Sequence, residues 1–415
     1  MSWVLKAVLF LSAIMILMSS YVGWRVTGAI NQVTNWNQIY IKWMVLVVVI
    51  YLFIYPILGL VGNLFNVQGI IYAMRDGNKV IDYFFMYPFW FGLVFVSQLG
   101  ILLFGLEMAR FLVSLVYKSH FIQLKMAHAW LVVILTGATV VYVTAKIYLD
   151  TKTVKTVEIK VKIPNLPDDL HGFRIVHISD IQADNRTVES RMERYINAVN
   201  KLEPDIVIFT GDLVTYGTEY IQIGAEMMGR IKSKYGIYAC LGDHDYWSNP
   251  KQIVRSLKER GVVFFEDRNI PLGIRSSTVY MTLVTNIYSK HPNGDILKTL
   301  ASQINGSALK IFITHQPSPQ LIEFAAKNHY DIFLAGHTHG GQVALWLFGI
   351  KLAPALFETS YLSGQYRLGS MFINVNNGLG LTLAPIRYNA PASVTLIELE
   401  SQGHFAKRHY FRFFN

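Results

Sequence analysis

Long apolar runs, interrupted by short polar stretches, dominate the first 150 residues of the chain. Four of these runs are long enough to cross the roughly 30 Å hydrocarbon core of a membrane, which takes about 20 helical residues. They lie near Val4–Val22, Met44–Leu64, Phe89–Leu106 and Ala129–Ile147. Tryptophan and tyrosine residues stand close to the ends of these runs, as is typical of membrane interfaces. The pattern predicts a multi-pass anchor over residues 1–150 rather than a removable signal peptide.

After residue 150 the pattern changes to short β-rich runs that alternate with amphipathic segments. Between residues 151 and 168 the apolar side chains fall mostly on alternate positions with lysines between several of them, which predicts a strand with one wet face. Helical spacing begins at Thr187, an N-cap residue type, and stops at Pro204. Further helices are expected at Tyr220–Lys232 and Lys251–Arg260. Strands that alternate with helices predict a layered α/β domain over residues 151–415.

Chemically active residue types follow five of these β-rich runs. The runs end at Ser179, Thr210, Leu241, Thr314 and Ala335, and the residues that follow them are Asp180-Ile-Gln182, Gly211-Asp212, Gly242-Asp-His-Asp245, His315 and Gly336-His-Thr-His339. In α/β sheets such residues gather at the carboxyl edge of the strands. Carboxylates and imidazoles that meet at one edge are the ligand types of a metal centre.

The series D-x-Q, G-D, G-D-H-D, H and G-H-T-H resembles the pattern of the calcineurin-like metallophosphoesterases, which is D-x-H, G-D, G-N-H-D/E, H and G-H-x-H. The resemblance covers about residues 157–400. It includes the lead-in Leu170–Asp180, the turn Gly340–Gln342 and Pro385-Ile-Arg387. It implies two packed sheets with helices outside. The expected fold class is therefore α/β, with an N-terminal bundle of about four transmembrane helices followed by a two-sheet α/β sandwich metallophosphoesterase domain.

The resemblance also implies a site with two metal ions, either Mn²⁺ or iron, with Zn²⁺ as a further option. Asp180, Gln182, Asp212 and His339 would hold one ion, and Asp212, Asp243, His315 and His337 the other, with Asp212 as the bridge. Two such ions activate water and neutralise phosphoryl charge. His244 would stabilise the transition state or protonate the leaving oxygen, and Asp245 would orient the His244 imidazole.

Two ligand positions depart from the usual pattern of this family. Gln182 replaces a histidine, but its amide oxygen can still bind a hard metal. Asp243 replaces an asparagine and adds one negative charge to the metal shell, which a trivalent iron would compensate. Thr215 stands where relatives often carry a further acidic residue. These departures bear on activity and leave the expected fold unchanged.

The composition is consistent with this division of the chain. Of 415 residues, 52% are hydrophobic and only 15% are charged, which fits a protein that is partly in a membrane. The net charge of +10 fits proximity to anionic lipid; because no nucleic-acid module is recognisable, a nucleic-acid partner is not expected. Cys240 is the only cysteine and lies in an apolar run, which favours a buried core residue over a nucleophile.

Basic residues near the predicted spans indicate an orientation. An even number of spans places the N-terminus and the second half on the same side. The loops facing away carry Arg25, Lys42, Arg110, Lys118 and Lys125, an excess that would hold them in the cytoplasm. The lysines just after the last span, Lys152, Lys155, Lys160 and Lys162, oppose this but lead into a long domain, where charge has less influence. The expectation is a cell-membrane protein with an extracytoplasmic catalytic domain.

Glu107 and Arg110 lie one helical turn apart where the third apolar run continues toward Lys118. They could form a functional ion pair inside the membrane. The favoured interpretation is a helix that emerges into the lipid headgroups.

The leading functional interpretation is a membrane-anchored hydrolase that cleaves a phosphoester bond by metal-activated hydroxide. An alternative enzyme is a pyrophosphatase acting on a nucleotide–lipid or similar diphosphate. An alternative of another class is a degenerate domain that binds phosphorylated lipid or a partner without turnover, and a nuclease is disfavoured by the anchor. The expected partners are membrane lipids and a phosphorylated substrate that is amphiphilic or a lipid.

The segment Val343–Phe357 is unusually apolar for a chain that leaves an active-site loop. It is either an ordinary core strand or packed loop, which is favoured, or a lip in which Trp346, Leu347 and Phe348 touch the bilayer with Lys351 near headgroup phosphates. The tail Phe405–Phe414 is expected to form a final strand.

Overall fold

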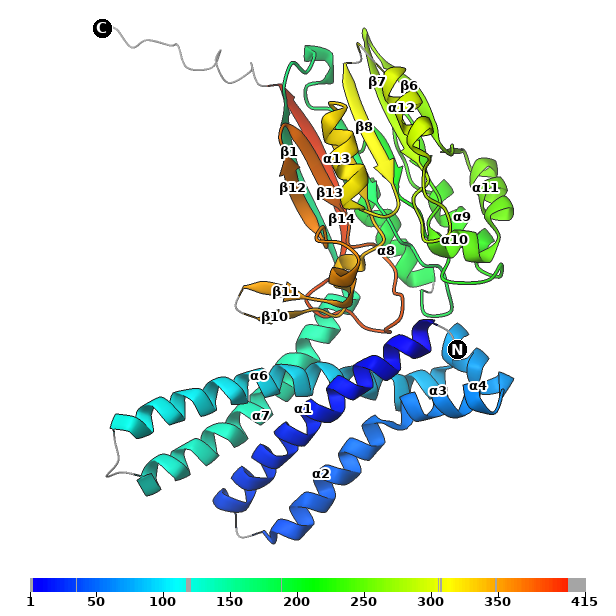
Figure 1. The fold of residues 1–415 in the computed structure, drawn as a ribbon. Helices are drawn as coiled ribbons and strands as arrows, with labels where there is room; N and C mark the ends of the chain where they lie inside the picture. Colours follow the sequence, from blue (N-terminus) through cyan, green and yellow to red (C-terminus); the bar gives the residue numbers. More distant parts are fainter. Residues whose placement is uncertain are drawn as a thin grey trace, which may run out of the picture. The chain divides into compact units, whose positions relative to one another are not determined.

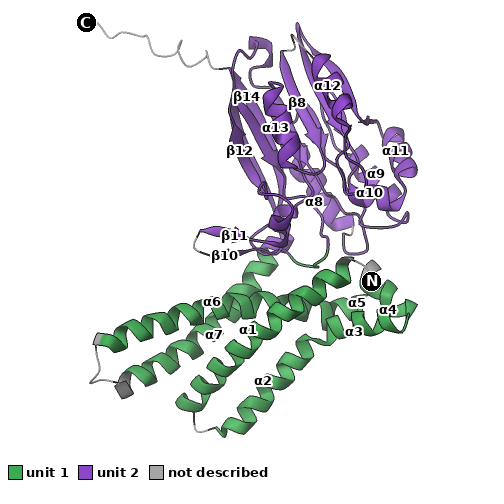
Figure 2. Ribbon diagram, viewed as in Figure 1, with its two compact units in different colours: residues 1–149, 383–386 green, residues 150–382, 387–415 purple. Residues whose placement is uncertain are grey.

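The computed structural model describes residues 3–34, 36–116, 121–187, 189–304, 306, 308–347 and 349–401. The chain divides into two compact units, coloured separately in Figure 2. The first comprises Met1–Leu149 and Leu383–Ile386, and the second comprises Asp150–Thr382 and Arg387–Asn415. The division expected at residue 150 lies next to this boundary, whereas the assignment of residues 383–386 to the first unit has no signal in the sequence.

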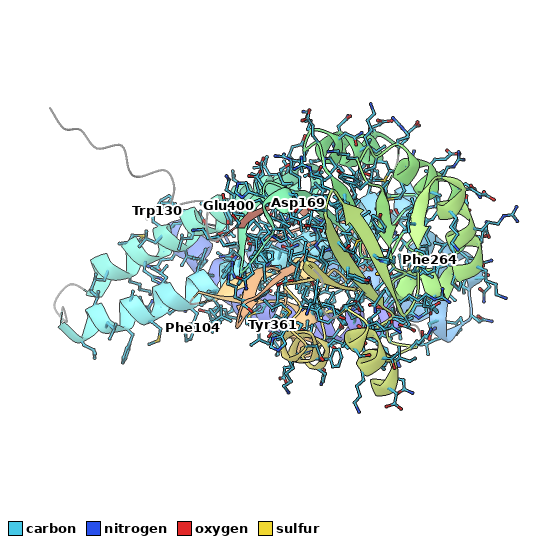
Figure 3. The ribbon with its side chains drawn as sticks, turned by 90° about the horizontal axis from the view of Figure 1, so that it is seen from above. Phe104, Trp130, Asp169, Phe264, Tyr361 and Glu400 are labelled. Carbon is cyan, nitrogen blue, oxygen red and sulfur yellow. The ribbon has the colours of Figure 1, made fainter. Side chains whose placement is uncertain are left out.

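The first unit is helical. Its elements are α1 (Trp3–Val33), α2 (Gln38–Leu52), α3 (Ile54–Leu64), α4 (Gln68–Asp76), α5 (Lys79–Ile81), a π-helical turn (Asp82–Met86), α6 (Tyr87–Val116) and α7 (Phe121–Lys152). Three segments, Val4–Val33, Lys79–Leu115 and Leu124–Lys152, are long and apolar enough to cross a membrane. Large apolar side chains such as Phe104 and Trp130 are exposed on them (Figure 3).

The second predicted span is broken. Helices α2 and α3 meet at an angle of 44° and count as a fourth span if the bent pair is taken as one. Pro56, in the first turn of α3, has no N–H to donate to the Leu52 carbonyl, so the continuous helix is interrupted here. The expectation of about four apolar helices at the N-terminus is confirmed as three such helices, or four if the bent pair is taken as one.

A charge cluster connects three helices of this unit. The Glu107 carboxylate on α6 pairs with the Arg25 guanidinium on α1, lies 2.7 Å from His128 Nε2 on α7, and lies 3.7 Å from Arg110 Nε. Arg25 and Arg110, which were counted as loop charges above, are therefore helix residues. A carboxylate is costly among apolar helices unless it is paired, which accounts for the three partners.

The second unit contains two six-stranded sheets (Figure 1). The first sheet has the order β1 (Val154–Ile163), β14 (Ala392–Ser401), β2 (Arg174–Ile178), β3 (Ile206–Phe209), β4 (Ile237–Ala239), β5 (Val262–Phe264). Figure 3 labels Glu400 on β14 and Phe264 on the edge strand β5, toward the two ends of this sheet. The second sheet has the order β12 (Gly364–Leu368), β13 (Met371–Val375), β9 (Ile332–Ala335), β8 (Leu309–Thr314), β7 (Ser277–Val284), β6 (Arg268–Ile274).

Apolar side chains of both sheets form a central core, in which Ile175, Ile208, Ile311 and Leu334 are fully buried. A second apolar cluster joins the first sheet to α8 (Glu189–Asn200), α9 (Ile221–Gly229) and α11 (Pro250–Glu259). A third joins the other sheet to α12 (Gly294–Ser302) and α13 (Pro319–Lys327). The predicted two-sheet sandwich with helices outside is confirmed.

The strands that precede the candidate ligands are parallel neighbours. In the first sheet β2 pairs with β3, and β3 with β4; in the second sheet β7 pairs with β8, and β8 with β9. Parallel strands end at the same edge of their sheet, so the residues that follow β2, β3 and β4, and those that follow β8 and β9, emerge together.

The segment that leaves the last candidate ligands forms neither a core strand nor a packed loop. It folds into a hairpin of β10 (Leu345–Leu347) and β11 (Ile350–Leu352), outside both main sheets, followed by the 3-10 turn Pro354–Phe357. The favoured core interpretation is wrong because Trp346 is 52% exposed, Ile350 62% and Phe357 87%. Leu347 is partly buried, while Phe348 and the tail Phe405–Phe414 lie outside the described residues.

Candidate metal centre

The backbone adopts left-handed conformations just after the strands that precede several candidate ligands. Five non-glycine ligand candidates have left-handed φ angles: Asp180 (50°), Gln182 (49°), Asp212 (62°), His337 (68°) and His339 (50°). This region is rarely used by residues with a side chain, and such conformations concentrate at functional sites. Here they turn the chain sharply after β2, β3 and β9.

These turns bring the candidate ligands into two groups that share His315. Ligand atoms of Asp243, His315 and His337 lie within 4.8 Å of one another, as do those of Asp180, Asp212 and His315. His315 Nε2 lies 3.4 Å from Asp212 Oδ2 and 3.5 Å from Asp243 Oδ2. Asp212 belongs to the second group, and its contact with the shared His315 brings it next to the first.

Hydrogen bonds determine which ring nitrogens face the centre. His315 Nδ1 donates to the Thr210 carbonyl at 2.7 Å, and His337 Nε2 donates to Glu358 at 2.9 Å. The remaining nitrogens, His315 Nε2 and His337 Nδ1, are 3.3 Å apart, and the latter is 3.1 Å from Asp243 Oδ2. Three electron-rich atoms at these distances repel one another unless a cation lies among them, so this group fits a metal ion.

The electrostatics of this group also favour positive charge. Burial lowers the pKa of His337, but hydrogen bonds to Asp243 and Glu358 outweigh it and raise that pKa to about 9. Burial raises the pKa of the Asp243 carboxyl, yet His315 and His337 hold it below its ordinary value. The centre therefore attracts a proton or a metal ion.

Near the group of Asp180, Asp212 and His315, two buried polar atoms of neighbouring candidate ligands lack a hydrogen-bond partner among the described residues. Gln182 Nε2 donates to Asp212 Oδ2 at 2.9 Å, which leaves Gln182 Oε1 for another partner. Gln182 Oε1 and His339 Nδ1 are both buried and have no hydrogen-bond partner among the described residues. His339 Nε2 lies 3.3 Å from Asp180 Oδ1. Buried polar atoms of this kind are costly unless an ion satisfies them, so Gln182, despite replacing histidine, fits a metal ligand.

The His244 side chain is held by a different residue from the one expected. Its backbone N–H donates to Asp212 Oδ1 at 2.9 Å, and its Nδ1 donates to the Thr215 carbonyl at 2.5 Å. Because a carbonyl can only accept, the proton is on Nδ1 and Nε2 faces away from Thr215.

The expectation that Asp245 orients the His244 imidazole is not what the structure shows. The Asp245 carboxylate accepts three backbone N–H groups, from Gly242 at 3.0 Å, Asp212 at 2.9 Å and Leu213 at 2.8 Å. His244 and Asp245 are successive residues in the first turn of α10 (Asp243–Ser248), and successive residues on a helix do not face each other. Burial and the Asp212 charge raise the pKa of Asp245 to about 7. Asp245 thus holds the turn that carries Asp212.

Residues 173–341 match the model of the calcineurin-like phosphoesterase family. The second unit is a calcineurin-like metallophosphoesterase domain. The chain is thereby a metal-dependent phosphoesterase of the hydrolase class, as the five motifs predict.

Three relatives illustrate the range of proteins that carry this domain. YkuE, an uncharacterized metallophosphoesterase of Bacillus subtilis, is 27% identical over 61% of this chain and 88% of its own. A transmembrane protein with metallophosphoesterase domain from Danio rerio is 26% identical over 59% of this chain and 57% of its own. The UDP-2,3-diacylglucosamine pyrophosphatase LpxG of Chlamydia muridarum is 23% identical over 60% and 90%, respectively.

Glycines permit the close approach of turns in the metallophosphoesterase domain. A Cβ atom on Gly242 would lie 2.2 Å from Asp212 Oδ1, and one on Gly336 would lie 1.8 Å from Ser179 Oγ. Neither distance is sterically possible, so any side chain at these positions would displace a ligand loop.

The buried Arg387 side chain supports the loop that packs against the candidate ligand Asp180. Its buried guanidinium donates to the carbonyls of Asn377, Gly378, Gly380 and Ala390, with the shortest contact, 2.6 Å, to Gly380. It also lies 3.4 Å from the His339 carbonyl. A Cβ atom on Gly378 would lie 2.6 Å from the Asp180 Cβ, so this loop packs directly on a ligand. Arg387 therefore has a positioning role that its weak sequence motif did not reveal.

Glu358 and Tyr288 are further site residues that carry no motif. Glu358 follows the 3-10 turn Pro354–Phe357 and orients His337 through the hydrogen bond described above. The Tyr288 backbone N–H donates to Asp243 Oδ1 at 2.6 Å, while Gln316 Nε2 donates to Asp243 Oδ2 at 2.8 Å. Both oxygens of Asp243 are thus held by N–H donors.

Two residues outside the motifs, His177 and Cys240, are buried structural residues. His177 is buried and hydrogen-bonded to Thr210 Oγ1 at 3.1 Å and to Asn374 Nδ2 at 2.7 Å, and burial lowers its pKa to about 3. Cys240 is buried, and burial raises its pKa to about 12, so the expectation of an inert core residue is confirmed.

Proposed function

We propose that the protein is a membrane-anchored phosphoesterase with two metal ions, whose substrate is an amphiphilic phosphate ester. Asp180, Gln182, Asp212 and His339 would hold one ion, and Asp212, Asp243, His315 and His337 the other. Divalent ions bound there would supply an activated water and neutralise charge on the phosphoryl oxygens. The proposal is supported by the convergence of the two ligand groups on His315, with Asp212 Oδ2 3.4 Å from His315 Nε2.

His244 would act on the leaving group. With the Nδ1 proton engaged by the Thr215 carbonyl, its protonated form can donate only from Nε2. Its backbone N–H is bonded to Asp212, which fixes the imidazole relative to the ligand that both ions share. The chain thereby couples the position of the proton donor to the position of the metals.

The observation that supports an amphiphilic substrate is an exposed apolar surface next to a residue of the candidate metal centre. We call this surface the apolar lip; it consists of Trp346, Ile350, Leu352, Leu356 and Phe357. Phe357, the most exposed of these, directly precedes Glu358, whose carboxylate is bonded to His337. Apolar contact contributes about 25 cal/mol per Å² buried, so an acyl chain resting on the lip would bind favourably. Transmembrane helices in the same chain support access to such a lipid.

A second candidate is hydrolysis of a nucleotide–lipid or similar diphosphate. It differs only in the bond cleaved, and one relative, LpxG, is named as a pyrophosphatase of a diacylated UDP-sugar. A degenerate, purely binding domain is disfavoured because His244 and the three histidines at positions 315, 337 and 339 are all present and gathered at one centre. The tether also disfavours a nuclease.

The test is a comparison of two substrates in the full-length protein. Trp346→Ser combined with Ile350→Ser should lower kcat/KM about tenfold for a phosphatidic-acid-type lipid, which corresponds to about 1.4 kcal/mol of lost apolar contact. Hydrolysis of p-nitrophenyl phosphate should stay within about twofold. Ile223→Ser combined with Ile296→Ser, which removes exposed apolar side chains from α9 and α12, is the matched control. Equal losses on both substrates would contradict the lipid role of the lip.

The extracytoplasmic orientation stays a prediction. Because Arg25 and Arg110 pair with Glu107 inside the helical unit, the charge asymmetry that supports it depends on Lys42, Lys118 and Lys125. A C-terminal fusion to a reporter that is active only outside the cytoplasm should give signal. A reporter that works only in the cytoplasm should stay silent, and the opposite result would reverse the orientation.

A further inference from the structure

A row of neighbouring rings connects His244 with the candidate ligand His337 through Trp247 and Tyr288. The His244 and Trp247 rings have centroids 4.9 Å apart, those of Trp247 and Tyr288 are 6.2 Å apart, and those of Tyr288 and His337 are 5.3 Å apart. The Trp247 and Tyr288 planes differ by only 2°. We call these two residues the aromatic wall.

Both rings of the aromatic wall are accessible although each neighbours a partly buried histidine. Trp247 is 38% exposed and Tyr288 52%. Large aromatic side chains contribute most to a fold when they are buried, so two parallel rings left accessible beside a reactive centre indicate a ligand contact.

Residues of the candidate metal centre fix the positions of Trp247 and Tyr288. Trp247 belongs to α10, whose first turn carries Asp243 and His244. The Tyr288 backbone donates to Asp243, and its hydroxyl is hydrogen-bonded to Glu358, which also binds His337. The rings are therefore placed before a ligand arrives, which reduces the entropy lost on binding.

The charges around the wall disfavour a second phosphate there. Lys290, in the same turn as Tyr288, is bound to Glu266 and lies 3.6 Å from Asp267 Oδ2. Glu358 adds a further carboxylate beside the Tyr288 hydroxyl. An uncharged ring suits this environment, because aromatic faces stack on one another without charge.

We infer that Trp247 and Tyr288 form a stacking subsite for an uncharged planar ring, such as a nucleobase or an aryl group, carried by the leaving group of the substrate. The assignment to the leaving group follows from the contact of Trp247 with His244, which protonates the leaving oxygen. The inference rests on the proposed hydrolase function. It adds that the leaving group of the substrate carries a planar ring.

The test measures binding rather than turnover. Benzylphosphonate and cyclohexylmethylphosphonate have the same carbon count, but only the first has a planar ring. Isothermal titration of the full-length, Mn²⁺-loaded protein in detergent should show that the benzyl compound binds about tenfold more tightly, as expected for one stacked ring. In Trp247→Leu, which keeps an apolar side chain and leaves the Tyr288 hydroxyl on Glu358, this preference should fall sharply. Trp247→Phe, which keeps a ring at this position, should retain it.

Inorganic phosphate separates the failure of this inference from that of the proposed function. It should bind the wild type and the leucine variant with affinities within about twofold, because the wall does not contact the phosphate. Phosphate binding to the wild type without a benzyl preference, or a preference that persists in the leucine variant, would overturn the stacking subsite alone. No phosphate binding to the metal-loaded wild type would overturn the proposed function.

Discussion

The charged clusters of the two units differ in whether the chain itself neutralises them. In the helical unit, the Glu107 carboxylate is surrounded by Arg25, Arg110 and His128, so its charge is neutralised within the chain. In the metallophosphoesterase domain, three carboxylates converge on histidines whose inward nitrogens carry lone pairs, and other buried polar atoms have no donor among the described residues. The Glu107 cluster, whose charges are paired within the chain, stabilises the fold. The cluster in the metallophosphoesterase domain, whose lone pairs need a cation, fits a ligand-binding site.

The largest effect that this comparison predicts is at Asp212. Asp212→Ala should remove the carboxylate that contacts His315, the residue that both ligand groups share, so the purified protein should lose most of its bound metal and all measurable phosphoesterase activity. Elemental analysis together with hydrolysis of p-nitrophenyl phosphate measures both. Asp331→Ala, which removes a carboxylate bonded to the Lys310 backbone away from the centre, should keep the metal. Full metal content and activity in Asp212→Ala would refute the bridging role.

His244 provides the next largest effect, and it separates chemistry from metal binding. His244→Ala should keep its metal content but lower kcat by about 10²–10⁴-fold, the usual contribution of general acid catalysis. The loss should shrink for leaving groups of low pKa, such as p-nitrophenol, since these depart without a proton. A uniform loss across leaving groups would contradict proton donation.

The ligand residues could be predicted from sequence, whereas most of what orients them could not. A β-rich run followed by a carboxylate or histidine is a local pattern, so β2, β3, β4, β8 and β9 and their ligands are visible in the chain. The carbonyl of Thr215 and the side chains of Glu358 and Arg387 reach the centre from positions without any local pattern. Sequence adjacency even misled in one case, since Asp245 follows His244 but faces the Asp212 turn.

The helical unit shows the same limit. Apolar length predicted its long helices, but the break between α2 and α3 and the partners of Glu107 depend on packing between helices. Positions 25, 107 and 128 are far apart in the chain and share no periodicity. Only the Glu107–Arg110 pair, one turn apart, was open to prediction, and it is present at 3.7 Å.

Glu107 is expected to matter for stability and not for metal binding. Glu107→Ala leaves Arg25 without its carboxylate among apolar helices, which should destabilise the helical unit by about 3 kcal/mol, the lower end for breaking a buried pair. Thermal unfolding in detergent should show the loss, while metal per folded molecule is unchanged. Arg110→Ala, which removes the more exposed partner, should cost under about 1 kcal/mol. Loss of metal in Glu107→Ala would break the distinction between the two clusters.

The smallest predicted effect tests whether Asp243 is a defect or a requirement. The Tyr288 backbone N–H, a donor that cannot be reversed, points at Asp243 Oδ1, and the other oxygen faces His315 and His337. An asparagine has one oxygen. Either its NH₂ meets the Tyr288 N–H, or it turns toward the metal position, where it cannot act as a ligand.

Asp243→Asn should therefore weaken metal binding by about 10–100-fold rather than restore an ordinary site, a loss in the range seen when an orienting contact of a metal ligand is removed. If the extra negative charge also selects a trivalent ion, the protein as isolated should contain iron, and the variant should shift toward Mn²⁺. Metal titration followed by elemental analysis separates the two effects. Unchanged affinity in Asp243→Asn would show that the Tyr288 contact does not select the carboxylate. Only divalent metals in both forms would instead remove the charge argument and leave the hydrogen-bond argument standing.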